Sequence, residues 1–129
     1  MEFDTKNSEN SMNIVIFSNS DYNFAAKLSK ICDLNSYQLI FLNDFKSLKP
    51  YIDTKNILLL IDFNDYENKI QNVNNSINNI GDFPCCVLLD IMSSKTHKEV
   101  TSMGFDIVMT KQSFLMNIKT IKKQITTSL

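Results

Sequence analysis

Two ionisable side chains stand at the ends of apolar runs in this chain. Asp62 directly follows the most apolar run, residues 57–61, and Lys111 closes the run that begins at Asp106. A carboxylate can accept hydrogen bonds or bind a hard cation, and an ammonium group can neutralise an anion. If the fold brings the two together, they form an ion pair that partly satisfies a semi-buried charge. We therefore predict a direct pair between Asp62 and Lys111 at the centre of the candidate site.

Other reactive side chains do not complete a catalytic set. Asp21, Asp65 and Asp90 also lie near the ends of apolar runs, and we treat them as secondary to Asp62. The single histidine, His97, lies in a polar stretch, and no Cys-His or Ser-His-Asp arrangement can be assembled around it. We therefore expect that the protein is not an enzyme.

The glycine content narrows the choice of ligand. Only Gly81 and Gly104 occur in the chain, so no glycine-rich loop can hold a phosphate or a dinucleotide. This excludes P-loop nucleotide hydrolases and classical dinucleotide-binding domains. Residues 18–21, after the first apolar run, also contain no glycine, which argues against a flavin-binding protein. A small flavodoxin-like ligand-binding protein or enzyme remains an alternative that a bound cofactor would support.

Length and composition describe one globular domain. The chain has 129 residues, of which 43% are hydrophobic and 21% are charged, with a net charge of −1. A charge so close to zero gives no reason to expect nucleic acid or an anionic membrane as the main partner. No apolar run approaches the ~20 residues that span a bilayer, and the first ten residues lack the apolar stretch of a signal peptide. We therefore expect a cytoplasmic protein.

The cysteines agree with a reducing compartment and predict no metal site. Cys85 and Cys86 are neighbours in an expected strand, so their side chains point to opposite faces of the sheet. No second cluster of cysteine or histidine is present to complete a site. We expect both residues to be small members of the core.

Apolar runs alternate with segments of helical periodicity along the chain. Runs typical of buried strands are residues 14–17, 37–42, 57–61, 85–89 and 106–109. Segments with apolar residues at helical spacing are 23–33, 45–52 (interrupted by Pro50), 66–80, 96–103 and 114–125. Helical crossovers imply parallel strands, so we predict an α/β fold. It is a flavodoxin-like, five-stranded parallel sheet of order 2-1-3-4-5, doubly wound with five helices. The domain should span residues 12–126, after a disordered lead-in of residues 1–11.

In such a sheet, Asp62 and Lys111 face the same crevice beyond the carboxyl ends of the strands. This arrangement, over residues 12–125, resembles the CheY-like receiver domain of bacterial response regulators. The stretch from Gly104 through Asp106 to Lys111 is similar to the family's approach to its invariant lysine. The resemblance implies that Asp62 accepts a phosphoryl group from a histidine kinase and that Lys111 contacts the phosphoryl oxygens.

The chain departs from the receiver pattern at positions that support phosphorylation. Where receivers carry an acidic pair after the first strand, it has Ser18 and Asn19. Leu89 stands where they carry Thr or Ser after the fourth strand, and Val108 stands at the aromatic switch position. Gln112 replaces the proline that normally follows the lysine. Asp62 is then the one carboxylate matched to the family's site, whereas Mg²⁺ needs several oxygen ligands.

We therefore predict an atypical receiver in two-component signal transduction, which acts by protein–protein interaction without phosphorylation and needs no cofactor. The alternative is a functional phosphoacceptor, in which a histidine kinase phosphorylates Asp62 and Asp62 helps to hold Mg²⁺. Expected partners are proteins: a histidine kinase, an effector, or an output domain that could follow the C-terminal end. Receivers often pair through their fourth helix, fifth strand and fifth helix, so a homodimer of that kind is a further option.

Overall fold

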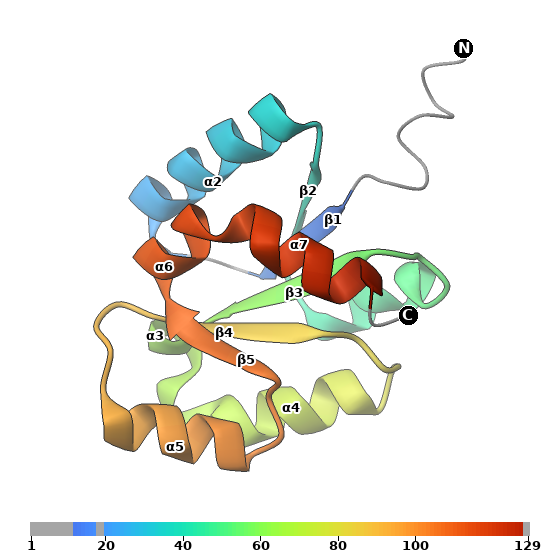
Figure 1. The fold of residues 1–129 in the computed structure, drawn as a ribbon. Helices are drawn as coiled ribbons and strands as arrows, with labels where there is room; N and C mark the ends of the chain where they lie inside the picture. The colour runs from blue at the N-terminus through green and yellow to red at the C-terminus, as the bar shows by residue number, and fades with distance from the viewer. Residues whose placement is uncertain (1–11, 18–19, 128–129) are drawn as a thin grey trace.

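Five apolar segments form one parallel sheet in the order β2-β1-β3-β4-β5 (Figure 1), as predicted. The computed structural model describes residues 12–17 and 20–127, and side chains as far as Ile125. The strands are β1 (Asn13–Phe17), β2 (Gln38–Leu42), β3 (Ile57–Asp62), β4 (Cys85–Leu89) and β5 (Ile107–Thr110). The lead-in predicted for residues 1–11 lies outside the described residues.

The remaining segments form helices of very different length. The α-helices are α2 (Tyr22–Asn35), α3 (Phe63–Tyr66), α4 (Ile70–Asn78), α5 (Ser94–Ser102), α6 (Lys111–Met116) and α7 (Ile118–Thr127). Two 3₁₀ helices complete the described chain, η1 (Phe45–Tyr51) and η2 (Glu67–Lys69). No helix within the described residues combines the length and the apolar character needed to cross a membrane.

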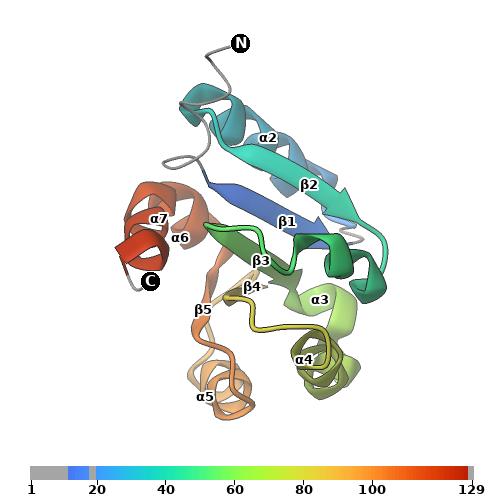
Figure 2. The ribbon, with the colours of Figure 1, turned by 90° about the vertical axis from the view of Figure 1, so that its right-hand side faces the viewer.

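The helices cover both faces of the sheet (Figure 2), so the core has two layers. On one face, Phe24 of α2, Phe114 of α6 and Ile118 of α7 pack against the sheet. On the other face, η1, α4 and α5 supply buried apolar residues. Every residue of β3 and β4 is buried, because these strands are covered from both sides. Cys85 and Cys86 lie in opposite layers, as predicted, and all three cysteines are free and buried.

Two predicted helices begin three residues before their apolar periodicity indicates. The predicted helix 66–80 starts at Phe63 and is divided into α3, η2 and α4, because the Asp62 carboxylate accepts the N–H of Asn64 and caps a helix at once. The predicted helix 114–125 starts at Lys111, where the Thr110 hydroxyl accepts the N–H of Ser113. Both starts lie directly at the ends of strands, so they fix the side chains of the candidate site.

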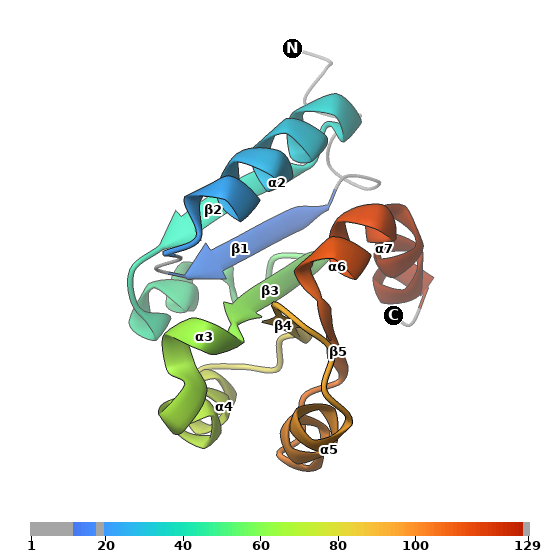
Figure 3. The same cartoon turned by 90° about the vertical axis from the view of Figure 1, so that its left-hand side faces the viewer.

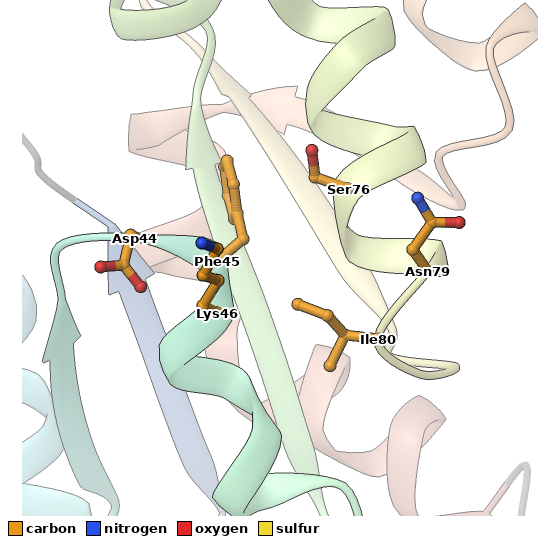
Figure 4. Close-up of a pocket in the computed structure, with 6 residues that line it drawn as sticks. All are labelled: Asp44, Phe45, Lys46, Ser76, Asn79 and Ile80. Atoms are coloured by element: carbon orange, nitrogen blue, oxygen red, sulfur yellow. The ribbon is translucent and has the colours of Figure 1, made fainter.

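The connection between β2 and β3 covers its side of the sheet incompletely. The helix predicted for residues 45–52 is the 3₁₀ helix η1, which contains Pro50; proline removes a backbone donor and favours such a short helix. A pocket of about 480 Å³ separates η1 from α4 (Figure 4). Four consecutive apolar residues of β2 are not fully buried: Leu39, Ile40, Phe41 and Leu42.

Candidate functional site

Three carboxylates converge on one ammonium group at the carboxyl end of the sheet. Lys111 Nζ lies 2.9 Å from Asp21 Oδ2, 2.9 Å from Asp62 Oδ2 and 2.7 Å from Asp90 Oδ1. We call these four residues the lysine cluster. The first turns of α2 and α3 lie beside the ends of β1 and β3 (Figure 3), which brings residues far apart in sequence into one site. The direct pairing predicted for Asp62 and Lys111 is therefore present.

Strand register decides which side chains reach the cluster. Asp62 is the last residue of β3 and pairs in register with Leu88 of β4, so both side chains point to the face that α2 and α6 cover. Asp90 comes two residues after Leu88 and returns to that same face. Leu89 pairs with Thr110, so Asp90 and Lys111 follow side by side at the ends of β4 and β5.

Asp62 is the buried member of the lysine cluster. Its side chain is 1% exposed, and its Oδ1 accepts the N–H of Asn64 at 3.1 Å. Its Oδ2 has no hydrogen-bond partner among the described residues, so the ionic attraction of Lys111 is its main compensation. Burial raises the pKa of Asp62 above its ordinary value, and Lys111 opposes this shift only in part.

The other two carboxylates are exposed to solvent and titrate differently. The side chains of Asp21 and Asp90 are 34% and 51% exposed. The hydrogen bond from Lys111 lowers the pKa of each of them. Burial alone would lower the pKa of Lys111, but the three carboxylates outweigh burial and raise it. Lys111 is therefore positively charged at neutral pH.

Neighbouring groups hold the loops of the cluster in place. Asp21 caps α2 by accepting the N–H of Phe24, whose ring centroid lies 5.9 Å from Lys111 Nζ. The side-chain amide of Asn64 donates a hydrogen bond to Asp90. Asp65 accepts the hydroxyl of Ser20 at 2.6 Å, which ties α3 to the segment that precedes α2.

Pockets near the carboxyl end of the sheet include residues of the lysine cluster, whereas the pocket between η1 and α4 does not. A pocket of about 510 Å³ opens on Asp21, Asp90 and Lys111. The pocket between η1 and α4 is lined by Asp44, Phe45, Lys46, Ser76, Asn79 and Ile80 and includes no cluster residue. Figure 4 shows that these side chains do not converge on one point, so we assign the candidate site to the lysine cluster.

The structure places the other predicted site residues as follows. Leu89, which is predicted to occupy the position where receivers carry Thr or Ser, is 3% exposed and lies in the core layer opposite to that of Leu88. The side chain that reaches Lys111 after β4 is that of Asp90. Val108 is buried in the layer that contains Leu89. Ser18 and Asn19 lie outside the described residues.

Asp21 and Asp90 are the site residues that sequence reasoning undervalued. Both were treated as secondary because neither matches a receiver position. A signal for Asp90 was available, because its side chain must lie on the face of Leu88 and Asp62 if β4 continues its alternation by two residues. Asp21 gives a weaker signal, since a helix-capping aspartate is common without any functional role.

The described residues do not fit the Mg²⁺ that the receiver resemblance implies. Mg²⁺ requires several oxygen ligands in a near-octahedral arrangement. In this structure the point at which the three carboxylates converge is taken by Lys111 Nζ. Among the described residues, no group of three or more acidic, histidine or cysteine side chains is arranged to hold a metal ion.

Comparison with known proteins defines the fold. No protein-family model and no curated protein matches the sequence. A response regulator from Thermotoga maritima superimposes with a TM-score of 0.66 at 13% identity, over 88% of this chain and 98% of that chain. A response regulator from Hahella chejuensis gives 0.65 at 18% identity, over 88% and 93%. A protein assigned to pilus assembly in Burkholderia thailandensis gives 0.63 at 16% identity, over 88% and 99%.

The chain therefore has the fold of CheY-like receiver domains, with the same doubly wound sheet that carries the site at its carboxyl end. Identities of this size describe the fold and leave the function to be argued from the cluster itself.

Proposed function

We propose that this chain is an atypical receiver module that takes part in signal transduction through protein contacts, without phosphorylation of Asp62. The observation that carries the proposal is the sharing of the Lys111 ammonium by three carboxylates at 2.7–2.9 Å. In a phosphoacceptor site, such an ammonium would stabilise the charge of the phosphoryl group. Here it is already engaged by three anions.

Charge balance at the cluster opposes phosphoryl transfer. Three carboxylates face one ammonium, so the cluster already has negative charge in excess. Transfer of a phosphoryl group to Asp62 would place a further anion beside Asp21 and Asp90. Phosphoryl transfer depends on positioning and on neutralising this charge. The cluster side chain that directly follows β4 is the acid Asp90, which repels a phosphoryl group, whereas a hydroxyl would donate a hydrogen bond to it.

Exposed apolar side chains beside the cluster support a role in protein contact. Tyr22 follows Asp21 and is 81% exposed, and Ile91 and Met92 follow Asp90 and are 81% and 50% exposed. Exposed large apolar side chains next to a polar site are a feature that protein interfaces share. A kinase, an effector or an attached output domain is the expected class of partner, in the cytoplasm. Pairing of two copies through α5, β5, α6 and α7 stays a prediction.

A second candidate function is a phosphoacceptor receiver modified on Asp62. The position of Asp62 at the end of the central strand, with Lys111 beside it, favours this function. It requires that Mg²⁺ or a partner displace Lys111 from at least one carboxylate.

The test is the intact mass of the protein after incubation with acetyl phosphate and Mg²⁺. We expect no phosphoryl adduct on the wild type or on the control Asp62→Ala. An adduct on the wild type that Asp62→Ala lacks would overturn the proposal and establish the second candidate.

A matched variant, Asp90→Thr, tests whether excess negative charge at the cluster is the reason that Asp62 resists phosphorylation. It removes one competing carboxylate and places a hydroxyl at the end of β4. We expect a larger fraction of phosphorylated protein for this variant than for the wild type. If Asp90→Thr and the wild type are equally resistant while both remain folded by circular dichroism, Asp90 is not the cause of the resistance.

A further inference from the structure

The open edge of β2 has the features of a strand that pairs with another strand. β2 forms one edge of the sheet and pairs with β1 on its inner side only, within the described residues. None of its four apolar residues is fully buried, and Phe41 is 60% exposed. The central strands, in contrast, are completely buried.

The direction of the backbone groups along β2 follows from one hydrogen bond. The N–H of Gln38 donates to the carbonyl of Met12 at 2.9 Å, so it points toward β1. Successive residues of a strand direct their N–H and C=O groups to alternate sides. The N–H and C=O groups of Leu39 and Phe41 therefore point to the open edge.

The usual protection of an edge strand is absent from β2. Natural edge strands carry charges, proline or bulges, or remain very short, because an open edge invites pairing with another chain. The sequence from Gln38 to Leu42 contains no charge and no proline. The opposite edge strand, β5, has four residues, one fewer than β2, and directly follows the exposed Asp106. The two edges are therefore unequal, and β2 is the one open to pairing.

We propose that β2 pairs in an antiparallel manner with β2 of a second copy of this chain, about a two-fold axis at Ile40. In this register Leu39 of one copy lies opposite Phe41 of the other, and both residues have their backbone groups directed at the partner. Each such pair exchanges two hydrogen bonds, so the two pairs form four. The side chains of Leu39 and Phe41 lie on the same face and pack as cross-strand neighbours.

A second copy suits this edge because, in the register about Ile40, only uncharged residues lie opposite one another and no like charges meet. The outward-facing residues are placed symmetrically about Ile40, which is the requirement for an isologous two-fold contact. β2 has only five residues. Stable interfaces bury roughly 1,200–2,000 Å² in total, so a contact built on this strand is small and reversible. The dimer should therefore depend on protein concentration.

The experiment is sedimentation velocity over a wide range of protein concentration. We expect the wild type to shift from monomer to dimer as the concentration rises. Phe41→Lys should weaken the dimer by roughly ten- to thirtyfold, since two cross-strand pairs are lost together. The control Phe41→Leu keeps an apolar side chain and should still form the dimer. Circular dichroism must show all three proteins to be folded.

A second variant separates backbone pairing from apolar contact. Phe41→Pro removes a backbone N–H that points to the open edge and leaves the hydrogen bonds to β1 intact; it should abolish the dimer. A wild type that stays monomeric at every concentration, or a Phe41→Lys variant that dimerises as well as the wild type, would overturn the proposal. So would amide hydrogen exchange in which dimer formation protects residues 96–110 and leaves Leu39 and Phe41 unprotected.

Discussion

The lysine cluster contains one buried carboxylate, Asp62, and two exposed carboxylates, Asp21 and Asp90. All three lie at nearly the same distance from Lys111, but their pKa values shift in opposite directions. Asp62, Asp21 and Asp90 all lie 2.7–2.9 Å from Lys111 Nζ. The Asp62 side chain is 1% exposed, and burial raises its pKa, whereas Lys111 lowers the pKa of the exposed Asp21 and Asp90. Exposure to solvent therefore determines whether the folded protein favours the charged or the neutral form of each carboxylate.

This difference makes Lys111 far more important to the buried carboxylate than to the exposed two. Water can solvate Asp21 and Asp90 if the lysine is removed. Asp62 would keep only the N–H of Asn64 and would be left as a buried charge without a counter-ion. Each part of the cluster can be tested by removing one charge at a time.

The largest effect is expected for Lys111→Met. This variant should lower the free energy of unfolding by about 3–5 kcal/mol at neutral pH, because it leaves the buried Asp62 charge uncompensated. Urea unfolding measures the change. The control is Lys119→Met, which removes an exposed lysine of α7 and should change stability by less than about 0.5 kcal/mol. Equal stability of Lys111→Met and the wild type would show that the cluster does not support the fold.

Low pH should restore part of the stability that the Lys111→Met variant loses. Without Lys111, the buried Asp62 takes up a proton more readily, because burial is then opposed by no cation. Its folded pKa lies above the unfolded value, so its contribution to stability is favourable at low pH and is lost as pH rises through the folded pKa. The stability difference from the wild type should therefore shrink between pH 7 and pH 5, as measured by urea unfolding. A constant difference over this range would contradict the assignment to Asp62.

Asp62→Asn should have a smaller effect than Lys111→Met. It removes the desolvated charge together with its ion pair, and leaves Lys111 two carboxylate partners, so we expect a loss of about 1 kcal/mol at neutral pH. The raised pKa of Asp62 predicts the sign of the pH dependence. The wild type should gain stability relative to Asp62→Asn as pH falls from 7 toward 4. If the wild type instead lost stability relative to Asp62→Asn as pH fell, Lys111 and not burial would control the pKa of Asp62.

The fold could be predicted from the sequence because the information is local and repeated. The apolar runs of β1, β3 and β4 are continuous, and only a sheet covered on both faces buries every residue of such a run. The helix at η1 could not be predicted in this way, since Pro50 and the weak periodicity of residues 45–52 leave the type of helix open. The early starts of α3 and α6 depend on capping by Asp62 and Thr110, which competes with apolar periodicity.

The candidate site could be predicted only in its centre. Asp62 and Lys111 stand at the ends of strands, and the strand order then brings them together. Asp90 could be given only a secondary place because it matches no receiver position, although it follows Leu88 by two residues and reaches Lys111. Alternation along the strand therefore carries information about Asp90 that a match by sequence position does not use.

The smallest effects are expected for Asp21→Asn and Asp90→Asn. Each keeps an acceptor for its neighbour, the N–H of Phe24 or the amide of Asn64, and removes only an exposed charge. We expect a loss of at most about 1 kcal/mol for each at low salt, reduced further by added salt.

Their pH dependence should be opposite to that of Asp62→Asn. The pKa of each of these carboxylates is lowered in the folded state, so its stabilising contribution is present above the unfolded value of about 3.9 and is lost as pH falls. The wild type should therefore lose its advantage over both variants as pH falls below 4, whereas its gain over Asp62→Asn occurs as pH falls from 7 toward 4. Urea titrations of the three variants in parallel measure this divergence. If the stability of all three variants depended on pH in the same way, the three carboxylates would titrate as one unit, and their different exposure would not separate their pKa values.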